Sequence, residues 1–333
     1  MLILTREDVR SLIDIDAVID AVEAAHAALA TGEASQAIDQ ATRLPQGAGV
    51  MLPMAAAMRT PPVAGVKVLT DVPGNAALGL RSQHSTITLV DPATGQCIAF
   101  LDGVEITLHR TAAASAVATR HLARADAQTL GLVGAGAQAR SHLAALRTVR
   151  EFSRVTVWSR TRETAERFAA DHADSDIPVE ILDSPEAVVR SADVLCTLTP
   201  TREPLIRGEW FRPGLHVNAV GAPPRPDHRE LDSEAVRRSL VVVDDLASAL
   251  DRSGEVCIPI AEGVIAAAHI HADLGHVILG TRPGRTREDQ ITLFNSVGLA
   301  LQDMATSRLI LDRATEAGVG LRLDLAAGSQ HAE

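Results

Sequence analysis

The feature that most constrains the fold is a regular alternation of strand-like and helix-like segments, which begins near residue 129. Helices are expected over 137–149, 162–172 and 184–191, where Pro185 can open the last of them at its first turn. The segments with the apolar texture of strands are 129–133, 154–158, 178–182, 194–198, 216–220 and 240–244. Repeated alternation of this kind predicts an α/β fold with a parallel sheet covered by helices on both faces.

A glycine-rich turn lies at the first junction between strand and helix. It reads Gly134-Ala135-Gly136-Ala137-Gln138-Ala139. The first glycine permits a tight turn, the second allows the backbone to approach a pyrophosphate, and Ala139 replaces the third glycine of the usual fingerprint. The helix that follows would present unpaired N–H groups to the phosphates. The pattern predicts a Rossmann dinucleotide-binding domain, and a purely structural turn is the alternative.

The end of the second strand bears on the choice of nucleotide. An NAD site usually has Asp or Glu at this place, which binds the ribose hydroxyls. This chain has Ser159-Arg160-Thr161 and no acid before Glu163. Arg160 with the two hydroxyls is suited to a 2′-phosphate, so the sequence favours NADP over NAD. The absence of an acid does not exclude NAD, and arginines that are merely solvated are the alternative.

The part of the chain before residue 129 has a different organisation. A helix is expected over 14–30, strands over 63–70, 85–90 and 96–101, a hairpin turn over 91–95 and a helix over 111–123. A long helix is expected near the C-terminal end, over about 287–317. Because 333 residues are many for one core, we expect two domains.

Two features of the composition bear on chemistry. The chain has no tyrosine, which excludes a mechanism that depends on a tyrosine acid, and Lys67 is the only lysine among 31 basic residues. Arginine serves as a surface cation everywhere else, but a buried lysine can lose a proton and arginine effectively cannot. Lys67 lies in an apolar strand-like segment, residues 64–70, so it is a candidate for a function beyond surface charge.

Charge and cysteine usage exclude other classes. The net charge of -11 and the lack of a long basic run argue against a nucleic-acid partner. Cys97, Cys196 and Cys257 are isolated, which fits neither a disulfide framework nor a zinc site, and no metal is expected. The charged N-terminal residues and the lack of a long apolar stretch predict a cytoplasmic protein without a membrane partner.

Three basic residues stand in contexts unlike those of surface arginines. Lys67 lies in its apolar strand, Arg110 lies beside small residues where a helix is expected to begin, and Arg43 precedes a Pro/Gly loop. Cations in apolar surroundings are costly unless they are paired or used. Together, two arginines and a lysine would form a clamp for a carboxylate, which Arg can bind through two hydrogen bonds.

At these residues the sequence resembles the ornithine cyclodeaminase/mu-crystallin family over nearly its whole length. The segments that carry the resemblance are GVKVLT (65–70), HRTAAASA (109–116), LVGAGAQA (132–139), VWSRTRETAERFA (157–169), GEWFRPGLHVNAVGA (208–222), RPDHRELD (225–232), DLGHVILGTRPGRT (273–286) and FNSVGLALQDMA (294–305). Several specific motifs in the same order identify the family more strongly than the glycine turn does.

The resemblance implies an architecture and a set of site residues. It implies a substrate-binding and dimerisation domain of α+β type from residues 1–115 with 305–333, an NAD(P)-binding Rossmann domain from 116–304, and a homodimer joined through the former. It places the substrate carboxylate on Arg43, Lys67 and Arg110. The cofactor-binding residues that it implies, or that the fingerprint predicts, are Thr111, Gly134, Gly136, Ala137, Gln138, Ser159, Arg160, Thr161, Thr197, Val220 and Val297.

At one position this chain differs from part of the family. The resemblance implies that cyclodeaminases, and some of the alanine dehydrogenases, have an acid two positions after the glycine that corresponds to Gly221, where this chain has Pro223. Asp227 is expected to order the loop, and Asp303 to serve in capping or packing. The branch that the sequence resembles is mu-crystallin, whose members reduce ketimines with NADPH.

We therefore expect an NAD(P)H-dependent reductase of small α-imino acids, or an amino-acid dehydrogenase. Lys67 is the expected proton donor, because a lysine desolvated beside two arginines should have a lowered pKa. The alternatives are a deaminating lyase that recycles bound NAD and a binding protein without activity.

Overall fold

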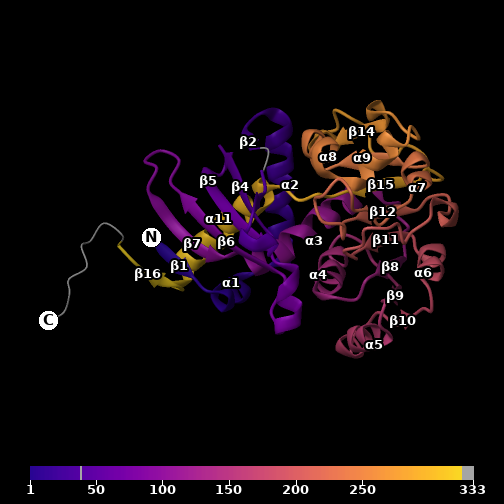
Figure 1. Cartoon of the computed structure of the whole chain (residues 1–333), viewed down its shortest axis with the longest axis horizontal. Helices are drawn as coiled ribbons and strands as arrows, with labels where there is room; N and C mark the ends of the chain where they lie inside the picture. The colour runs from indigo at the N-terminus through magenta and orange to yellow at the C-terminus, as the bar shows by residue number, and fades with distance from the viewer. Residues whose placement is uncertain (38–39, 325–333) are drawn as a thin grey trace. The chain divides into compact units, whose positions relative to one another are not determined.

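The computed structural model describes residues 1–37 and 40–324, which divide into two compact units (Figure 1). Unit 1 comprises Met1–Ala21, Thr31–Arg110 and the chain from Leu299 onwards, and unit 2 comprises Val22–Ala30 and Thr111–Gly298. Helices α2 (Ile15–Thr31) and α3 (Gly103–Leu122) contribute residues to both. The domain boundaries expected from the sequence, after residue 115 and before residue 305, stay a prediction.

Unit 2 is built on an eight-stranded parallel sheet with the order β10-β9-β8-β11-β12-β15-β13-β14. Consecutive strands run outward from β8 in one direction as far as β10, and the chain then returns to place β11 on the other side of β8. The strand order therefore reverses between β8 and β11, which is where α/β sheets bind their ligands. The strands are β8 (Thr129–Val133), β9 (Arg154–Trp158), β10 (Val179–Ile181), β11 (Val194–Thr197), β12 (His216–Ala219), β13 (Leu240–Val243), β14 (Ile270–Asp273) and β15 (Thr292–Asn295).

The helices of unit 2 follow the pattern that the alternation predicts. Every residue of β8, β11 and β12 is buried, as expected for strands covered on both faces. Ser184 caps α6 through a hydrogen bond from the Ala187 amide at 3.1 Å, with Pro185 in the first turn. The helices are α4 (Ala137–Leu146), α5 (Arg162–Asp171), α6 (Pro185–Ser191), α7 (Ser233–Arg237), α8 (Leu246–Arg252), α9 (Gly254–Ala261) and α10 (Leu274–Ile278).

The expected long helix over 287–317 is wrong in its first half. Residues Thr292–Asn295 form strand β15, which pairs with both β12 and β13, and only Ala300–Ala317 form a helix, α11. The reason is tertiary, because these four residues are completely buried between two strands. Gly298, with a φ of 83°, then breaks the chain direction before α11.

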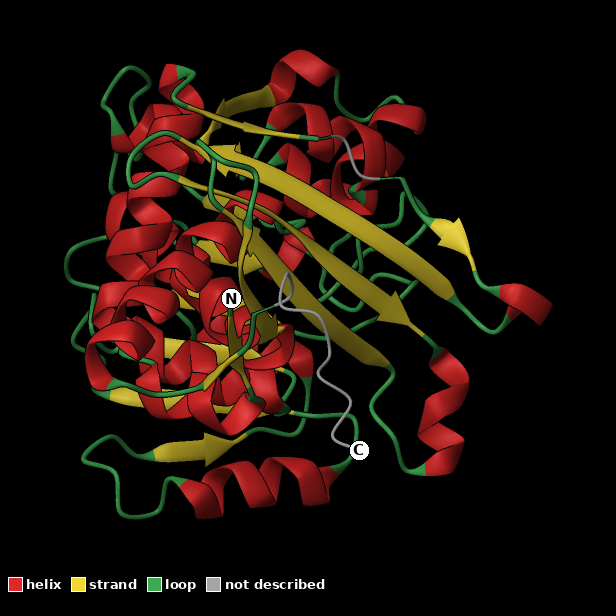
Figure 2. Ribbon diagram, turned by 90° about the vertical axis from the view of Figure 1, so that its left-hand side faces the viewer, coloured by secondary structure: helices red, strands yellow, loops and turns green. Residues whose placement is uncertain are grey.

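Unit 1 contains a mainly antiparallel sheet with the order β16-β1-β7-β6-β5-β4-β2, and β3 pairs with β4. Its long strands run side by side in Figure 2. Helix α11 packs against β4 and β5, and Gly65 permits this approach, since a Cβ there would lie 2.8 Å from Met304 Sδ. The strands are β1 (Leu2–Leu4), β2 (Ala34–Gln36), β3 (Thr42–Arg43), β4 (Val50–Met58), β5 (Val63–Asp71), β6 (Gln83–Val90), β7 (Cys97–Asp102) and β16 (Leu321–Arg322), and helix α1 (Arg6–Leu12) belongs to the same unit.

The expected hairpin turn joins β6 to β7. The Asp91 amide donates to the Gln96 carbonyl at 2.9 Å, and the Asp91 carboxylate accepts from the Ala93 and Thr94 amides. The helix expected over 111–123 begins earlier, at Gly103. Arg110 therefore lies about two turns inside α3 and not at its entrance.

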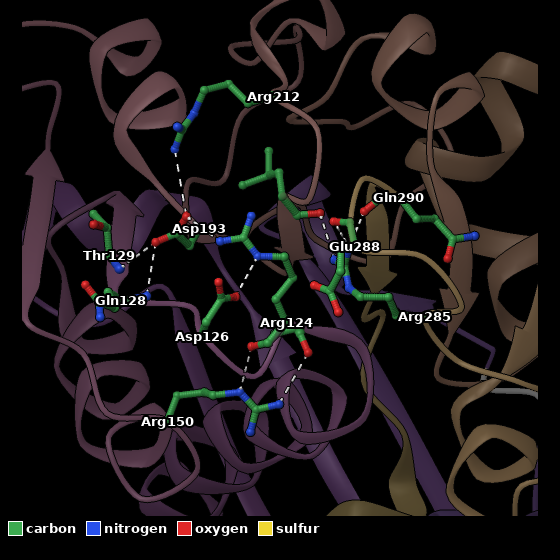
Figure 3. A network of polar contacts seen from close by, with 12 residues as sticks. Arg124, Asp126, Gln128, Thr129, Arg150, Asp193, Arg212, Arg285, Glu288 and Gln290 are labelled. Carbon is green, nitrogen blue, oxygen red and sulfur yellow. Dashed lines mark hydrogen bonds and ion pairs between the residues drawn. The ribbon is translucent and has the colours of Figure 1, made fainter.

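A polar network ties the amino ends of the unit 2 strands together (Figure 3). Asp193, which precedes β11, accepts from the Gln128 and Thr129 amides at 3.0 Å and forms ion pairs with Arg124 and Arg212. Nearby, the Arg285 guanidinium donates to the backbone carbonyls of residues 122, 215, 288 and 290, and burial lowers its pKa to about 10. This edge is opposite to the glycine turn, so we assign the network to stability.

None of the helices within the described ranges is long and apolar enough to span a bilayer.

Candidate functional site

The glycine turn of unit 2 has the geometry that a dinucleotide fingerprint requires. Gly134 has a φ of 109°, and its amide donates to the Trp158 carbonyl at 2.8 Å. A Cβ at this position would lie 2.8 Å from the Leu198 carbonyl oxygen. The turn from β8 into α4 therefore requires glycine here for both conformation and space.

The second glycine of the turn faces open space. Gly136 is exposed and caps α4 at its N-terminus, and an added Cβ would meet no atom within 4 Å. The first-turn amides of Ala137 and Gln138 have no partner within their own helix. Ala139 is buried against the sheet. A helix N-terminus with open space at Gly136 fits the pyrophosphate of a nicotinamide dinucleotide.

The residues after β9 differ in how their charges are used. Arg160 is exposed, and in the described part of the chain it forms no ion pair or hydrogen bond. Arg162, two residues on, binds Glu166 at 3.1 Å and Asp183 at 3.2 Å. Ser159 is half-buried, and the Thr161 hydroxyl bonds with that of Thr164. Arg160 is thus available to a ligand phosphate, whereas Arg162 is already paired.

Three other predicted cofactor residues lie at the same carboxyl edge of the sheet. Thr197 ends β11, Val220 follows β12 and Val297 follows β15. The Thr197 hydroxyl donates its hydrogen to Glu230 at 2.6 Å, so it can only accept a further bond. Thr111 lies buried in α3.

The loop that contains Val297 is held by a buried acid. The Asp244 carboxylate accepts from the Gly298 amide at 2.7 Å and lies 3.4 Å from the Ser296 hydroxyl. Burial raises the pKa of Asp244 to about 6. This acid therefore holds the Gly298 backbone on one side of Val297 and contacts the Ser296 side chain on the other.

In unit 1 the candidate substrate residues converge on one acid. Lys67, in β5, is 1% exposed, and its Nζ lies 3.1 Å from both carboxylate oxygens of Asp303, in α11. Arg110 Nε donates to Asp303 Oδ1 at 3.0 Å, and its Nη1 donates to Gln302 Oε1 at 2.9 Å. A buried acid therefore joins the two cations that the sequence singled out.

Asp303 is the functional residue that the sequence reasoning missed. Of its expected roles, capping is wrong, because Leu299 is the N-cap of α11, and packing is incomplete, because the fully buried Asp303 also accepts from both Lys67 and Arg110. An acid inside the apolar run 299–305 was the available signal, since a buried carboxylate needs a cation. The expectation of a lowered Lys67 pKa assumed two neighbouring arginines and no acid. Asp303 supplies an opposite charge that favours the ammonium form.

Arg43 lies apart from this pair but on the same face of the sheet. It is exposed in β3 and pairs with Val50, while Met54, four residues along β4, pairs with Lys67. Directly paired residues point to the same face, so Arg43 and Lys67 share one, about 13 Å apart along the strand direction.

Of the described residues, no three His, Cys, Asp or Glu side chains gather in a way that could hold a metal ion.

The comparisons with known proteins agree on one family over most of the chain. A model of the ornithine cyclodeaminase/mu-crystallin family matches residues 1–318. An alanine dehydrogenase of Archaeoglobus fulgidus is 35% identical, with 97% of this chain and 98% of that protein covered. A delta(1)-pyrroline-2-carboxylate reductase of Bacillus cereus is 36% identical, with 97% and 100% covered. The ketimine reductase mu-crystallin of Mus musculus is 39% identical over 74% of each chain.

Solved structures are also similar to the chain over nearly its full length. The delta(1)-pyrroline-2-carboxylate reductase of Thermococcus litoralis, in complex with NADH and L-proline, is 38% identical with a TM-score of 0.93, and 97% of this chain and 100% of that chain are covered. An archaeal alanine dehydrogenase dimer with bound NAD is 34% identical with a TM-score of 0.93, over 98% and 99% of the two chains.

Proposed function

The chain belongs to the ornithine cyclodeaminase/mu-crystallin family, and from this premise we propose that it is an NAD(P)H-dependent enzyme that reduces a small α-imino acid, or reductively aminates an α-keto acid, to the amino acid. The single observation that carries the proposal is the buried cluster of Lys67, Asp303 and Arg110. Relatives that reduce an imine, by their names, support it over nearly the full length of the chain.

The charge of the cluster is suited to an acidic substrate. Lys67 and Arg110 carry two positive charges and Asp303 one negative charge, so the buried group has a net charge of about +1. Such an excess is stabilised by an anionic ligand. We assign the substrate carboxylate to Arg110 and Lys67, with Arg43 binding it from the exposed end of the same sheet face.

The chain's own residues hold the proton that the reduction consumes. Lys67 Nζ carries it as an ammonium, which the Asp303 carboxylate stabilises at 3.1 Å. When bound, the nicotinamide supplies a hydride to the imine carbon. Lys67, directly or through a water, gives its proton to the imine nitrogen. Asp303 keeps the lysine side chain oriented while its amino group is neutral.

We propose NADP as the preferred cofactor, with NAD as the alternative. The support is Arg160, an exposed cation free of ion pairs among the described residues, at the place where a 2′-phosphate is bound. The similar solved structures hold NADH or NAD, so the finer choice depends on direct measurement.

The loop after β12 favours reduction over deamination by a lyase. Pro223 stands where the resemblance to cyclodeaminases implies an acid, and proline has no group that can take a proton. Asp227, the nearest acid in the loop, is exposed and binds Arg202 and His228. Neither residue supplies the base that an amino acid substrate would need.

We also propose that the chain forms a homodimer through its substrate domain. The support is the alanine dehydrogenase dimer that is 34% identical to it.

The test is oxidation of NADPH and of NADH against a panel of substrates. The panel contains cyclic ketimines and, each with ammonia or methylamine, pyruvate, glyoxylate and oxaloacetate. We expect one mole of amino acid for each mole of cofactor oxidised. Product formed from an amino acid without net oxidation would instead indicate a lyase, and tight NADPH binding without turnover of any substrate would indicate a binding protein.

A further inference from the structure

A second buried acid, Glu230, lies in unit 2 at the carboxyl edge of the parallel sheet. It is completely buried, and both of its carboxylate oxygens are occupied. Oε1 accepts from the Thr199 amide and the Thr199 hydroxyl, each at 2.7 Å, and Oε2 accepts from the Thr197 hydroxyl at 2.6 Å and the Gly221 amide at 2.7 Å. Four donors therefore converge on one side chain.

The donors come from two neighbouring strands. Thr197 is the last residue of β11, and Thr199 lies two residues beyond it. Gly221 lies two residues beyond β12. The two chain segments approach closely at this point, since a Cβ on Gly221 would lie 2.1 Å from the Thr199 nitrogen. Glu230 thus fixes the spacing of the ends of β11 and β12, and β11 is the neighbour of β8 at the point where the strand order reverses and the glycine turn lies.

The four donors favour the ionised carboxylate of Glu230, and they oppose burial, which raises the pKa of this group. The amides of Thr199 and Gly221 can only donate, so a protonated carboxyl group would have to give its hydrogen to a threonine hydroxyl that then turns its own hydrogen away. The neighbouring acid, Glu255, accepts from the Glu230 amide at 2.6 Å and from the Leu231 amide at 3.2 Å. Burial, with the negative charge of Glu230, raises the pKa of Glu255 to about 8, so Glu255 is the member of the pair that we expect to hold a proton at neutral pH.

We propose that Glu230 is a positioning residue whose carboxylate holds the ends of β11 and β12 in the geometry that the nicotinamide cofactor requires. It acts through Thr197, Thr199 and Gly221 and does not itself bind the cofactor. The inference rests on the proposed function only in that it assumes a nicotinamide cofactor. The cofactor affinity is therefore the quantity to measure.

The experiment compares two buried acids by the same substitution. In E230Q, the amide nitrogen faces donors that have lost their acceptor, so the dissociation constants for NADH and NADPH, measured by nicotinamide fluorescence, should rise at least about tenfold. The matched control is E255Q, because glutamine imitates the protonated Glu255. Its dissociation constants should stay within about threefold of the wild type. Thermal unfolding of each variant without cofactor separates loss of fold from loss of affinity.

A second pair of variants leaves Glu230 in place. T199V removes one hydroxyl donor and should weaken binding, whereas T199S keeps that donor and should bind more tightly than T199V. This pair decides the matter if E230Q does not fold. Wild-type affinity in E230Q, or an equal loss in E255Q, would overturn the inference. A wild-type protein that binds neither NADH nor NADPH would overturn the proposed function and this inference together.

Discussion

The ammonium of Lys67 lies 3.1 Å from both carboxylate oxygens of Asp303, and neither side chain is more than 1% exposed. The only lysine of the chain is thus paired with an acid on a helix 236 residues away. Arg110 binds the same acid at 3.0 Å, so removal of either member of the pair leaves a different residual charge.

That difference predicts unequal losses of stability. Asp303→Asn leaves two buried cations without a counter-charge and should lower the free energy of unfolding by about 3–5 kcal/mol. Lys67→Met leaves Asp303 bound to Arg110 and should cost less, about 1–3 kcal/mol. The double variant should be more stable than the sum of the two losses implies. Denaturant unfolding of all four proteins measures this coupling, and strictly additive losses would show that the pair is not energetically linked.

Lys67→Arg tests the proton-donating role. Arginine keeps the positive charge beside Asp303 but does not release a proton near neutral pH. We expect kcat for imine reduction to fall by about 100-fold or more, with a smaller change in KM for the imino acid. The thermal midpoint and NADPH affinity serve as controls for folding. Wild-type turnover in this variant would restrict Lys67 to carboxylate binding.

The sequence predicts the features that depend on local pattern. The glycine turn, the strands β8 to β13 and the opening of α6 at Pro185 all follow from short segments with distinctive chemistry. Strand β15 could not be predicted in this way, because its helix-like flanks are overridden by pairing with β12 and β13. The fold class can therefore be predicted from the sequence where each strand or helix is determined by its own residues.

The site is less predictable than the fold because its residues act in groups distant in sequence. Lys67 and Arg110 are conspicuous as cations in apolar segments, but nothing local indicates that Asp303 binds both. Glu230 lies in a polar segment, RPDHRELD, where an acid is typical of the surface. Its burial depends on donors from two other strands, Thr197 and Gly221 among them.

The two glycines of the turn should respond differently to alanine. Gly136→Ala places a methyl group in open space at a φ of −82°, so stability should stay within about 0.5 kcal/mol of the wild type. The methyl group would occupy the place of the pyrophosphate, so the affinity for NADPH should fall at least about tenfold. Gly134→Ala should also lose about 1–3 kcal/mol of stability, because its φ of 109° is strained for alanine. Unchanged NADPH binding by Gly136→Ala would place the pyrophosphate elsewhere.

Arg160→Ala tests the preference for NADP. Loss of a cation that binds the 2′-phosphate should raise the dissociation constant for NADPH by about tenfold or more and leave that for NADH nearly unchanged. Arg162→Ala is the matched control, because Arg162 is equally close in sequence but already binds Glu166 and Asp183. Fluorescence titration with both cofactors gives the ratio. Equal effects of the two substitutions would remove the argument for a phosphate site at Arg160.

The pH dependence of stability above neutrality should report on Glu255. Its pKa is about 8 in the folded protein, against 4.5 for the ordinary group, so between these values the folded state holds a proton that the unfolded state has lost. The free energy of unfolding should therefore fall as pH rises through this range, by up to about 1.4 kcal/mol per pH unit from this group. The stabilisation is complete below pH 4.5 and is lost above pH 8.

The buried histidines and Asp244 act outside the upper part of that window. Burial lowers the pKa of His26 and His142 to about 4 and of His216 to about 3, so these histidines change stability only below 6.5, and in the opposite direction. Asp244, with a pKa of about 6, has largely lost its proton by the same point. Denaturant unfolding between pH 6.5 and pH 8 should therefore show a decline in the wild type that is flattened in Glu255→Gln. Equal slopes in the two proteins would mean that Glu255 is already ionised at neutral pH, and that Glu230 does not carry the charge of the pair alone.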